Sequence, residues 1–339
     1  MSCCQRGQSP RGTVPSRFRR ALGFEAGALL LLAVALTGLG GSLPVSRAEG
    51  TDPGSMSPPC ALCGPGRRPE AGFAPMIGVC ASIDDAAMAR SAGCDYIEES
   101  VRGFLVPDRP GPEFTEKFAL LEASPLPVLA CNSFLPEALK SVGPEARHDG
   151  IIAFAATAFR RARRAGVKHI VFGSSGSRAI PDGFDPAEAR RQFIGLLRRL
   201  GPVARRQGVV VALEPLRRAE CNFINTVAEG AGIVREVGDP GVRLLADIYH
   251  MLCEDEGPAS ILAAGHLLVH CHIAEEEGRS APGVHGEDFR PYLEALRRIG
   301  YAGGISFEGR WTDLAEELPV AVKTLEAQIA AVAGSAGRT

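Results

Sequence analysis

Short apolar runs alternate with longer amphipathic stretches along most of the chain, from Met76 onward. Most of the runs are rich in Val, Ile and Leu, and they are bounded by Gly, Pro or Asn. This pattern is typical of parallel strands that are buried on both faces. The predicted strands are residues 76–82, 94–100, 127–133, 169–175, 209–215, 242–250, 267–275 and 303–309.

The stretches between these strands repeat apolar residues at helical spacing. Residues 149–166 and 186–208 are amphipathic in this way, and Asp288 can cap a helix over 289–300. Eight β-then-α units over about 255 residues predict an α/β fold, the (β/α)8 TIM barrel. The alternative is an open doubly wound sheet. It would normally carry a glycine-rich phosphate loop after its first strand, and the ASIDDA that follows MIGVC is not such a loop.

The N-terminal part of the chain has a different pattern. A basic segment precedes a short apolar run, and the small residues Ser46 and Ala48 occupy the −3 and −1 positions of a cleavage site. This pattern predicts a signal peptide over residues 1–48. Residues 49–75 are rich in Pro, Gly and Ser, which predicts a flexible linker. The barrel domain is therefore expected over 76–333, behind a disordered or cleaved extension.

Two localisations follow from this extension. A signal peptide would export the protein to the periplasm, whereas a true start at Met76 would make the extension an over-long reading of the gene and the protein cytoplasmic. Cys60 and Cys63 form a CxxC pair without a second pair, which is weak evidence for zinc and would favour a disulfide only in an exported protein.

Charge and composition narrow the expected partners. The formal net charge is −2 and aromatic residues make up 6% of the chain. There is thus no broad basic field to attract nucleic acid or an anionic membrane, and few rings are available to stack on bases. We expect a small-molecule partner, no nucleic acid and no stable membrane partner, and homo-oligomerisation stays open.

Polar side chains end four consecutive strands that are otherwise mostly apolar. They are Glu214, Asp247, His272 and Glu308. The carboxyl ends of the strands meet at one mouth of a TIM barrel. An unpaired carboxylate is costly to bury, so four such groups at one mouth are best explained by a cation among them. Three carboxylates and one imidazole favour a hard or borderline divalent ion, such as Mn²⁺, Co²⁺ or Mg²⁺.

The segments around these residues carry a family resemblance. They are VALEPLRRAECNFINT, ADIYHML, HCHIAE and GYAGGISFEGRW. In order and spacing they resemble the xylose-isomerase-like TIM-barrel superfamily, and most closely its ketose 3-epimerase and hydroxypyruvate isomerase branch. The resemblance implies that Glu214, Asp247, His272 and Glu308 bind one divalent ion. Mn²⁺ is the ion expected first, with Co²⁺ and Mg²⁺ as alternatives. The resemblance also implies that Glu214 and Glu308 are the catalytic residues that transfer protons.

The same resemblance assigns substrate contacts to Glu220, His250 and Arg279. Each of these residues also has an ordinary interpretation, as a loop carboxylate, a packed histidine and a solvated loop arginine. The implied function is a metal-dependent isomerase or epimerase of a small sugar or keto-sugar, with an enediolate intermediate and a carbohydrate as its partner. An inosose-type dehydratase would use the same site.

Two further alternatives are weaker. An endonuclease that acts at abasic sites would need a three-metal cluster with histidines from the second and third strands. Those strands end in Glu98-Glu99-Ser100 and Cys131-Asn132-Ser133, without a histidine. A non-catalytic sugar-binding barrel would not need both glutamates and a full set of metal ligands.

The HCHIAE segment brings two histidines together on one strand. His270 and His272 are two residues apart and face the same side, whereas Cys271 faces the other. We expect His272 to be the ligand and His270 to lie one layer deeper in the barrel as a hydrogen-bonded support. Cys271 should pack against the helices, and Glu275 should orient part of the site.

Overall fold

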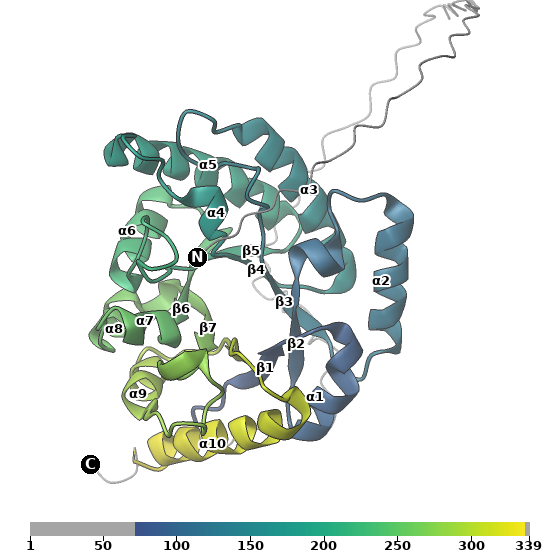
Figure 1. Cartoon of the computed structure of the whole chain (residues 1–339), viewed down its shortest axis with the longest axis vertical. Helices are drawn as coiled ribbons and strands as arrows, with labels where there is room; N and C mark the ends of the chain where they lie inside the picture. The colour runs from purple at the N-terminus through teal and green to yellow at the C-terminus, as the bar shows by residue number, and fades with distance from the viewer. Residues whose placement is uncertain (1–71, 336–339) are drawn as a thin grey trace, which may run out of the picture. The chain divides into compact units, whose positions relative to one another are not determined.

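Eight parallel strands close into a barrel with helices around it in a computed structural model that describes residues 72–335 (Figure 1). The predicted signal peptide, the linker up to residue 71 and the CxxC pair lie outside the described residues. Among the helices described, none is long and apolar enough to cross a membrane. The predicted TIM barrel is confirmed.

Each strand lies inside one of the predicted apolar runs. The strands are β1 (Met76–Cys80), β2 (Tyr96–Ser100), β3 (Val128–Asn132), β4 (His169–Phe172), β5 (Val210–Leu213), β6 (Val242–Asp247), β7 (Leu268–Ile273) and β8 (Gly304–Phe307). Neighbours in the sequence are neighbours in the sheet, and β1 also pairs with β8 to close it, with Val79 opposite Phe307. All carboxyl ends therefore point to the same mouth.

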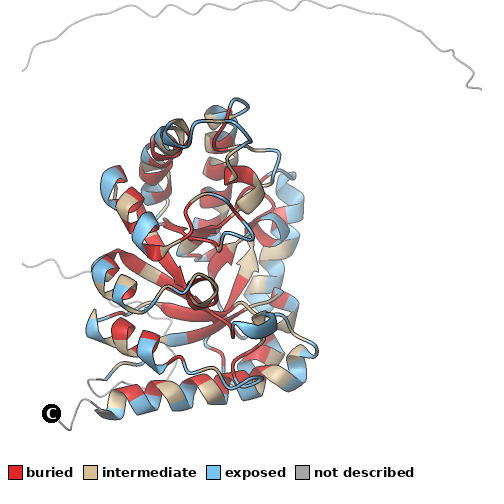
Figure 2. Ribbon diagram, turned by 60° about the vertical axis from the view of Figure 1, so that its left-hand side comes forward, coloured by how far each residue is buried: buried red, intermediate tan, exposed pale blue. Residues whose placement is uncertain are grey.

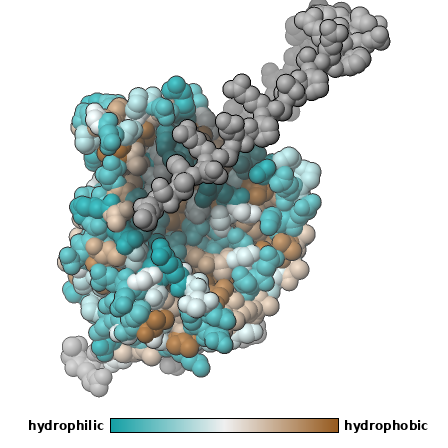
Figure 3. Space-filling model, in the orientation of Figure 1, coloured by the Kyte–Doolittle hydropathy of each residue, from teal (hydrophilic) through white to brown (hydrophobic). Residues whose placement is uncertain are grey.

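The helices cover the outside of the barrel. They are α1 (Ala86–Ala92), α2 (Gly111–Ala123), α3 (His148–Ala165), α4 (Ser175–Arg178), α5 (Pro186–Arg206), α6 (Val227–Val237), α7 (Ile248–Cys253), α8 (Ala259–Ala264), α9 (Arg290–Arg298) and α10 (Leu314–Ser335). Their inner faces are buried and their outer faces exposed (Figure 2), as the amphipathic pattern predicts. The face drawn in Figure 3 is largely hydrophilic, with hydrophobic residues scattered over it.

The helix starts differ in one detail from the sequence expectation. Asp185 caps α5 by accepting a hydrogen bond from the backbone N–H of Ala187. Asp288 does accept a hydrogen bond from the N–H of Arg290, but the helix begins one residue later than expected, and Phe289 holds the N-cap position. The prediction that Asp288 is the cap is therefore off by one residue.

The interior of the barrel is divided into an apolar and a polar part. Val171, Ala212 and Leu245, from β4, β5 and β6, form an apolar cluster of their own. On the opposite side, Tyr96 of β2 is buried, and its hydroxyl lies 2.8 Å from Oγ of Ser306 on β8. The glycines of β1 and β8 leave room for this tyrosine, since a Cβ at Gly78 would overlap its ring.

Gly78→Ala should therefore destabilise the barrel, because the added methyl group meets the buried ring of Tyr96. Overpacking of this kind lowers the free energy of unfolding by about 1–3 kcal/mol, which urea denaturation followed by circular dichroism would measure. The control is Gly232→Ala inside α6, where a Cβ meets nothing within 4 Å. That variant should be as stable as the wild type, or up to about 1 kcal/mol more stable. Equal losses in the two variants would contradict the argument.

Candidate active site

Four strand ends bring their polar side chains together at the carboxyl mouth of the barrel. Each of Glu214, Asp247, His272 and Glu308 offers a donor atom, and these atoms all lie within 4.8 Å of one another. The first three residues are buried and Glu308 is partly buried. The structure thus assembles the quartet that the strand-end argument named. We call these four residues the quartet below.

The ring of His272 lies between two groups of carboxylates. Its Nδ1 is 3.1 Å from Oε1 of Glu214 and 3.0 Å from Oε2 of Glu308. Its Nε2, on the other side of the ring, is 3.0 Å from Oε1 of Glu98. The imidazole atom that faces the rest of the quartet is therefore Nδ1.

Arg279 reaches the quartet from the loop after β7. Its Nη2 donates to Oε2 of Glu308 at 2.6 Å and lies 3.2 Å from Oδ2 of Asp247, and its Nε donates to the carbonyl of Glu308. Its guanidinium also stands 4.6 Å from the centre of the Tyr249 ring. Burial opposes the charge of Arg279, but Asp247 and Glu308 outweigh it and raise its pKa. Arg279 is a fixed cation at the mouth, not a solvated loop arginine.

The two glutamates of the quartet have environments that push their pKa values in opposite directions. Burial, together with the charge of Glu308, raises the pKa of Glu214. Burial also acts to raise the pKa of Glu308, but His272 and Arg279 outweigh it, and the pKa is lowered. A pair of carboxyl groups with unequal affinities for a proton is what acid–base chemistry needs.

The remaining predicted substrate contacts line one pocket beside the quartet. The pocket has a volume of about 400 Å³, and Glu214, Glu220, His250, Arg279 and Glu308 contribute to its wall. Glu220 accepts from Nε of Arg217 at 2.9 Å and lies 3.8 Å from Nη1 of Arg279. His250 is buried, its Nε2 is 3.4 Å from Oδ2 of Asp247, and neither ring nitrogen has a hydrogen-bond partner among the described residues. Such a histidine has donor and acceptor capacity left for a ligand.

Further polar residues complete the wall of the pocket. They include Arg102, Asn132, Ser133, Ser174 and Ser175. Asn132, at the end of β3, donates to Oε1 of Glu308 at 3.2 Å. A wall of hydroxyl, amide and guanidinium groups suits a ligand that carries many hydroxyl groups.

Several contacts of the quartet escaped the sequence argument. Glu98, in the middle of β2, is buried, and its Oε1 lies 3.0 Å from Nε2 of His272. Arg178 is completely buried and donates to the carbonyl of Glu214 at 2.6 Å, which no local pattern indicates. At Gly173 a Cβ would overlap the carboxylate of Glu214, so a glycine is needed there.

The two histidines of the HCHIAE segment lie in successive layers of the barrel interior, as the alternation of side chains along a strand predicts. His270 lies below His272 and places its Nε2 2.7 Å from Oε2 of Glu98, whereas Cys271 belongs to the core between strands and helices. Glu275 is buried, and its carboxylate accepts hydrogen bonds from the N–H groups of Gly283 at 2.7 Å and Gly286 at 3.1 Å, and also from His285 and Glu287. It therefore holds the loop that follows the site.

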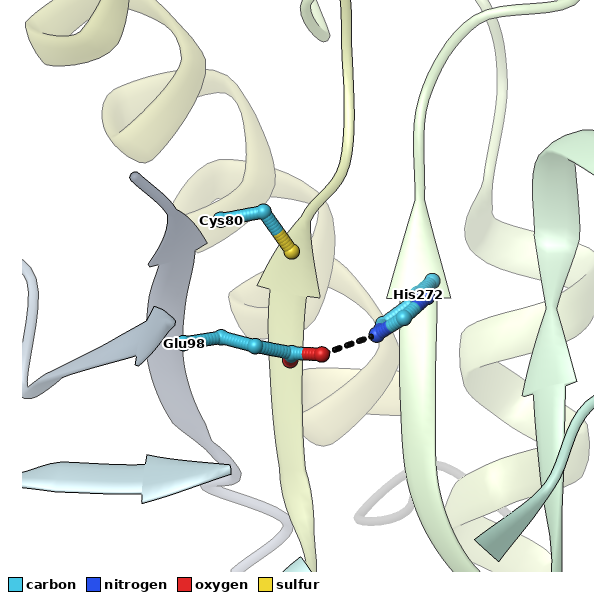
Figure 4. A group of neighbouring side chains, drawn as sticks. All are labelled: Cys80, Glu98 and His272. Atoms are coloured by element: carbon cyan, nitrogen blue, oxygen red, sulfur yellow. Dashed lines mark hydrogen bonds and ion pairs between the residues drawn. The ribbon is translucent and has the colours of Figure 1, made fainter. Parts of the chain in front are cut away.

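A second group of three donor side chains lies next to the quartet. Cys80 of β1, Glu98 of β2 and His272 of β7 have donor atoms within 4.8 Å of one another. Figure 4 shows the carboxylate of Glu98 extending toward the imidazole, with the Cys80 thiol beside them. Burial and the charge of Glu98 raise the pKa of the Cys80 thiol well above its usual value, so the thiol is neutral.

Comparison with known proteins identifies the family. The sequence profile of the xylose isomerase-like TIM barrel family matches residues 86–329. The chain belongs to this family. The resemblance drawn from the strand-end motifs is confirmed, and the eight-stranded barrel is the fold that this family name describes.

Members of the xylose isomerase-like family that are similar to this chain include named sugar epimerases. An L-ribulose 3-epimerase of Methylomonas sp. (strain DH-1) is 38% identical over 122 residues, which cover 36% of this chain and 42% of the relative. A 3-dehydro-D-guloside 4-epimerase of Escherichia coli (strain K12) is 38% identical over 122 residues, which cover 46% of that relative. The chain thus spans less than half the length of these two curated relatives.

A solved structure extends the similarity over the whole barrel. The D-allulose 3-epimerase from Methylomonas sp. in complex with D-allulose superposes with a TM-score of 0.64 at 25% identity. The superposition covers 76% of this chain and 99% of that structure.

Glu275→Gln should loosen the loop over residues 283–287. An amide accepts these hydrogen bonds less strongly than a carboxylate, and a hydrogen bond to a charged group contributes about 1.5–3 kcal/mol. The amides of Gly283 and Gly286 should therefore exchange with solvent about tenfold faster or more, which hydrogen–deuterium exchange with mass spectrometry would resolve. Glu276→Gln, the exposed neighbour, is the control and should leave the exchange unchanged. Equal protection in the two variants would show that Glu275 does not hold the loop.

Proposed function

We propose that this protein is a divalent-metal-dependent epimerase or isomerase of a small ketose or related keto-sugar. The observation that carries the proposal is the pair of glutamates, Glu214 and Glu308, whose carboxylates flank Nδ1 of His272 beside a polar pocket. The named activities of the similar family members, L-ribulose 3-epimerase and 3-dehydro-D-guloside 4-epimerase, support it.

The quartet fits a divalent cation by the chemistry of its donors. Three carboxylates and one imidazole nitrogen offer atoms within 4.8 Å of one another, and three of the four residues are buried. Buried carboxylates that crowd together repel one another unless positive charge lies among them. The oxygen-rich set suits Mn²⁺, with Co²⁺ or Mg²⁺ as alternatives. A bound ion would supply positive charge that stabilises the oxygens of an enediolate.

The protein's own groups would move the protons. The carbon that bears a hydroxyl next to a carbonyl is a carbon acid, and a carboxylate on one side of it can remove its proton. A carboxyl group on the other side can return a proton to the opposite face, which inverts the centre. If the proton is instead taken from C1 of a ketose and a proton is returned to C2, the product is an aldose. Glu214 and Glu308 would share these roles, and the configuration of the substrate decides which of them is the base.

The remaining pocket residues would hold the sugar. Arg279 donates to Glu308 and is positioned to fix both this carboxylate and a substrate oxygen, while His250 has free ring nitrogens. Glu220, on the same wall, accepts hydroxyl hydrogens. Asn132 donates to Glu308 and so keeps its carboxylate turned toward the pocket.

Glu308→Gln should abolish proton transfer without unfolding the barrel. The wild type, with Mn²⁺ and D₂O, should incorporate deuterium from solvent into a ketose such as D-allulose, as observed by NMR. The variant should lose this exchange by a factor of about 10²–10⁴, the usual contribution of a general acid or base, and Glu214→Gln should behave likewise.

Glu316→Gln is the matched control, since this carboxylate is exposed at the start of α10. Deuterium exchange by Glu308→Gln at the rate of the wild type would refute the assignment of Glu308 as a general acid or base. Exchange with an inosose, accompanied by loss of water, would turn the proposal toward a dehydratase.

Removal of divalent ions should stop the reaction reversibly. Dialysis against EDTA should abolish deuterium exchange because the enediolate loses the positive charge that stabilises it. Readdition of Mn²⁺ should restore the rate, and Asp247→Asn should raise the Mn²⁺ concentration required. Undiminished turnover by a protein shown by elemental analysis to be metal-free would refute the metal dependence.

A further inference from the structure

The buried carboxylate of Glu98 forms the closest support of the quartet from below. Its Oε1 is 3.0 Å from Nε2 of His272, and its Oε2 is 2.7 Å from Nε2 of His270. Oγ of Ser306 donates to the same Oε2 at 2.7 Å. Glu98 is 1% exposed and does not line the pocket, so it has no direct access to a substrate.

The two nitrogens of the His272 ring face different partners. Nε2 lies 3.0 Å from Oε1 of Glu98, whereas Nδ1 lies close to Glu214 and Glu308. A neutral imidazole carries a hydrogen on one nitrogen and a lone pair on the other. When Nδ1 donates its lone pair to a cation in the quartet, Nε2 carries the hydrogen, and this hydrogen points at Glu98.

We propose that Glu98 is a positioning residue for the metal site: by accepting a hydrogen bond from Nε2–H of His272, it fixes the orientation of the ring and makes Nδ1 a stronger donor toward the cation. This inference rests on the proposed function, because it presumes that the quartet binds a divalent ion. A carboxylate that accepts from the far nitrogen of a ligating histidine is a general way to orient and strengthen that ligand.

The polar half of the barrel interior is built around this carboxylate. Ser306 bridges Glu98 and the hydroxyl of Tyr96, which is 2.8 Å from Oγ of Ser306. On the other side, His270 stacks on His169 with ring centres 5.6 Å apart. Burial lowers the pKa of His169 to about 4, so this ring is neutral and adds no competing charge. Three strands besides β2 thus contribute to holding Glu98 in place.

The alternative use of Glu98, in a second metal site with Cys80 and His272, conflicts with the chemistry of the imidazole. A neutral imidazole has a single lone pair to donate, and a ring that binds a cation in the quartet through Nδ1, the atom beside Glu214 and Glu308, has none left on Nε2. The three side chains in Figure 4 are better explained as a support for one site.

The test compares Glu98→Gln with Glu99→Gln in the full-length protein. Glu99, the next residue on β2, accepts hydrogen bonds from the backbone N–H groups of Ile83 and Ser100 and does not touch His272. Mn²⁺ affinity is measured by isothermal titration calorimetry. Glu98→Gln should weaken Mn²⁺ binding by about 10–100-fold, the usual effect of removing such a partner, whereas Glu99→Gln should bind as the wild type does.

A spectroscopic readout separates positioning from general damage to the fold. In the Zn²⁺-loaded wild type, the Nε2–H proton of His272 should give a downfield, slowly exchanging ¹H resonance because it is bonded to a carboxylate. This resonance should persist in Glu99→Gln and move upfield in Glu98→Gln. If Glu98→Gln does not fold, Ser306→Ala replaces it: it keeps both carboxylate–histidine contacts but loses the hydroxyl on Oε2, and should weaken Mn²⁺ binding to a smaller extent.

The outcomes keep the two proposals apart. If the wild type binds Mn²⁺ and Glu98→Gln binds it as tightly, the positioning role is overturned while the proposed function stands. If Glu98→Gln does not fold, Mn²⁺ binding by Ser306→Ala that is as tight as that of the wild type has the same consequence. If the wild type itself does not bind Mn²⁺, both proposals fall. Weakened binding with an upfield resonance in Glu98→Gln alone supports the inference.

Discussion

Repulsion between buried carboxylates is the constraint around which this barrel is organised. Glu214, Asp247 and Glu308 approach one another at the mouth, where burial removes most of the water that would screen them. The protein places an imidazole ring and a cation among them: His272 in the centre and Arg279 above. A divalent cation would complete this balance. The arrangement is stable only because each charged group is met by a partner on another strand or loop.

The divided interior of the barrel follows from the same constraint. The strands β4, β5 and β6 fill their shared interior with small and branched apolar residues. The strands β2, β7 and β8 instead carry Glu98, His270 and Ser306, which are hydrogen-bonded to one another directly beneath His272. Polar side chains in a core are tolerated when they are hydrogen-bonded. The polar half therefore holds His272 in position from below, and the apolar half contributes hydrophobic packing.

The loops determine what the site can bind. Glu275 gathers the backbone N–H groups of the loop over residues 283–287, and Arg279 adopts a left-handed backbone conformation, φ 56°, that turns its side chain over the mouth. The pocket wall beyond the quartet comes largely from the loops after β3 and β4. In TIM barrels, the loops at this mouth decide which ligand fits.

The sequence by itself determined the strands, the barrel and the quartet, because these depend on local periodicity and on the rule that parallel strands end at one mouth. It also predicted that His270 and His272 lie in successive layers, since side chains alternate along a strand. Only the tertiary structure revealed the contacts that Glu98 and Arg178 make with the quartet. Glu98 and His272 are 174 residues apart in the chain, and their contact depends on how the barrel closes. Arg178 acts on a backbone carbonyl, a contact that leaves no trace in the pattern of side chains.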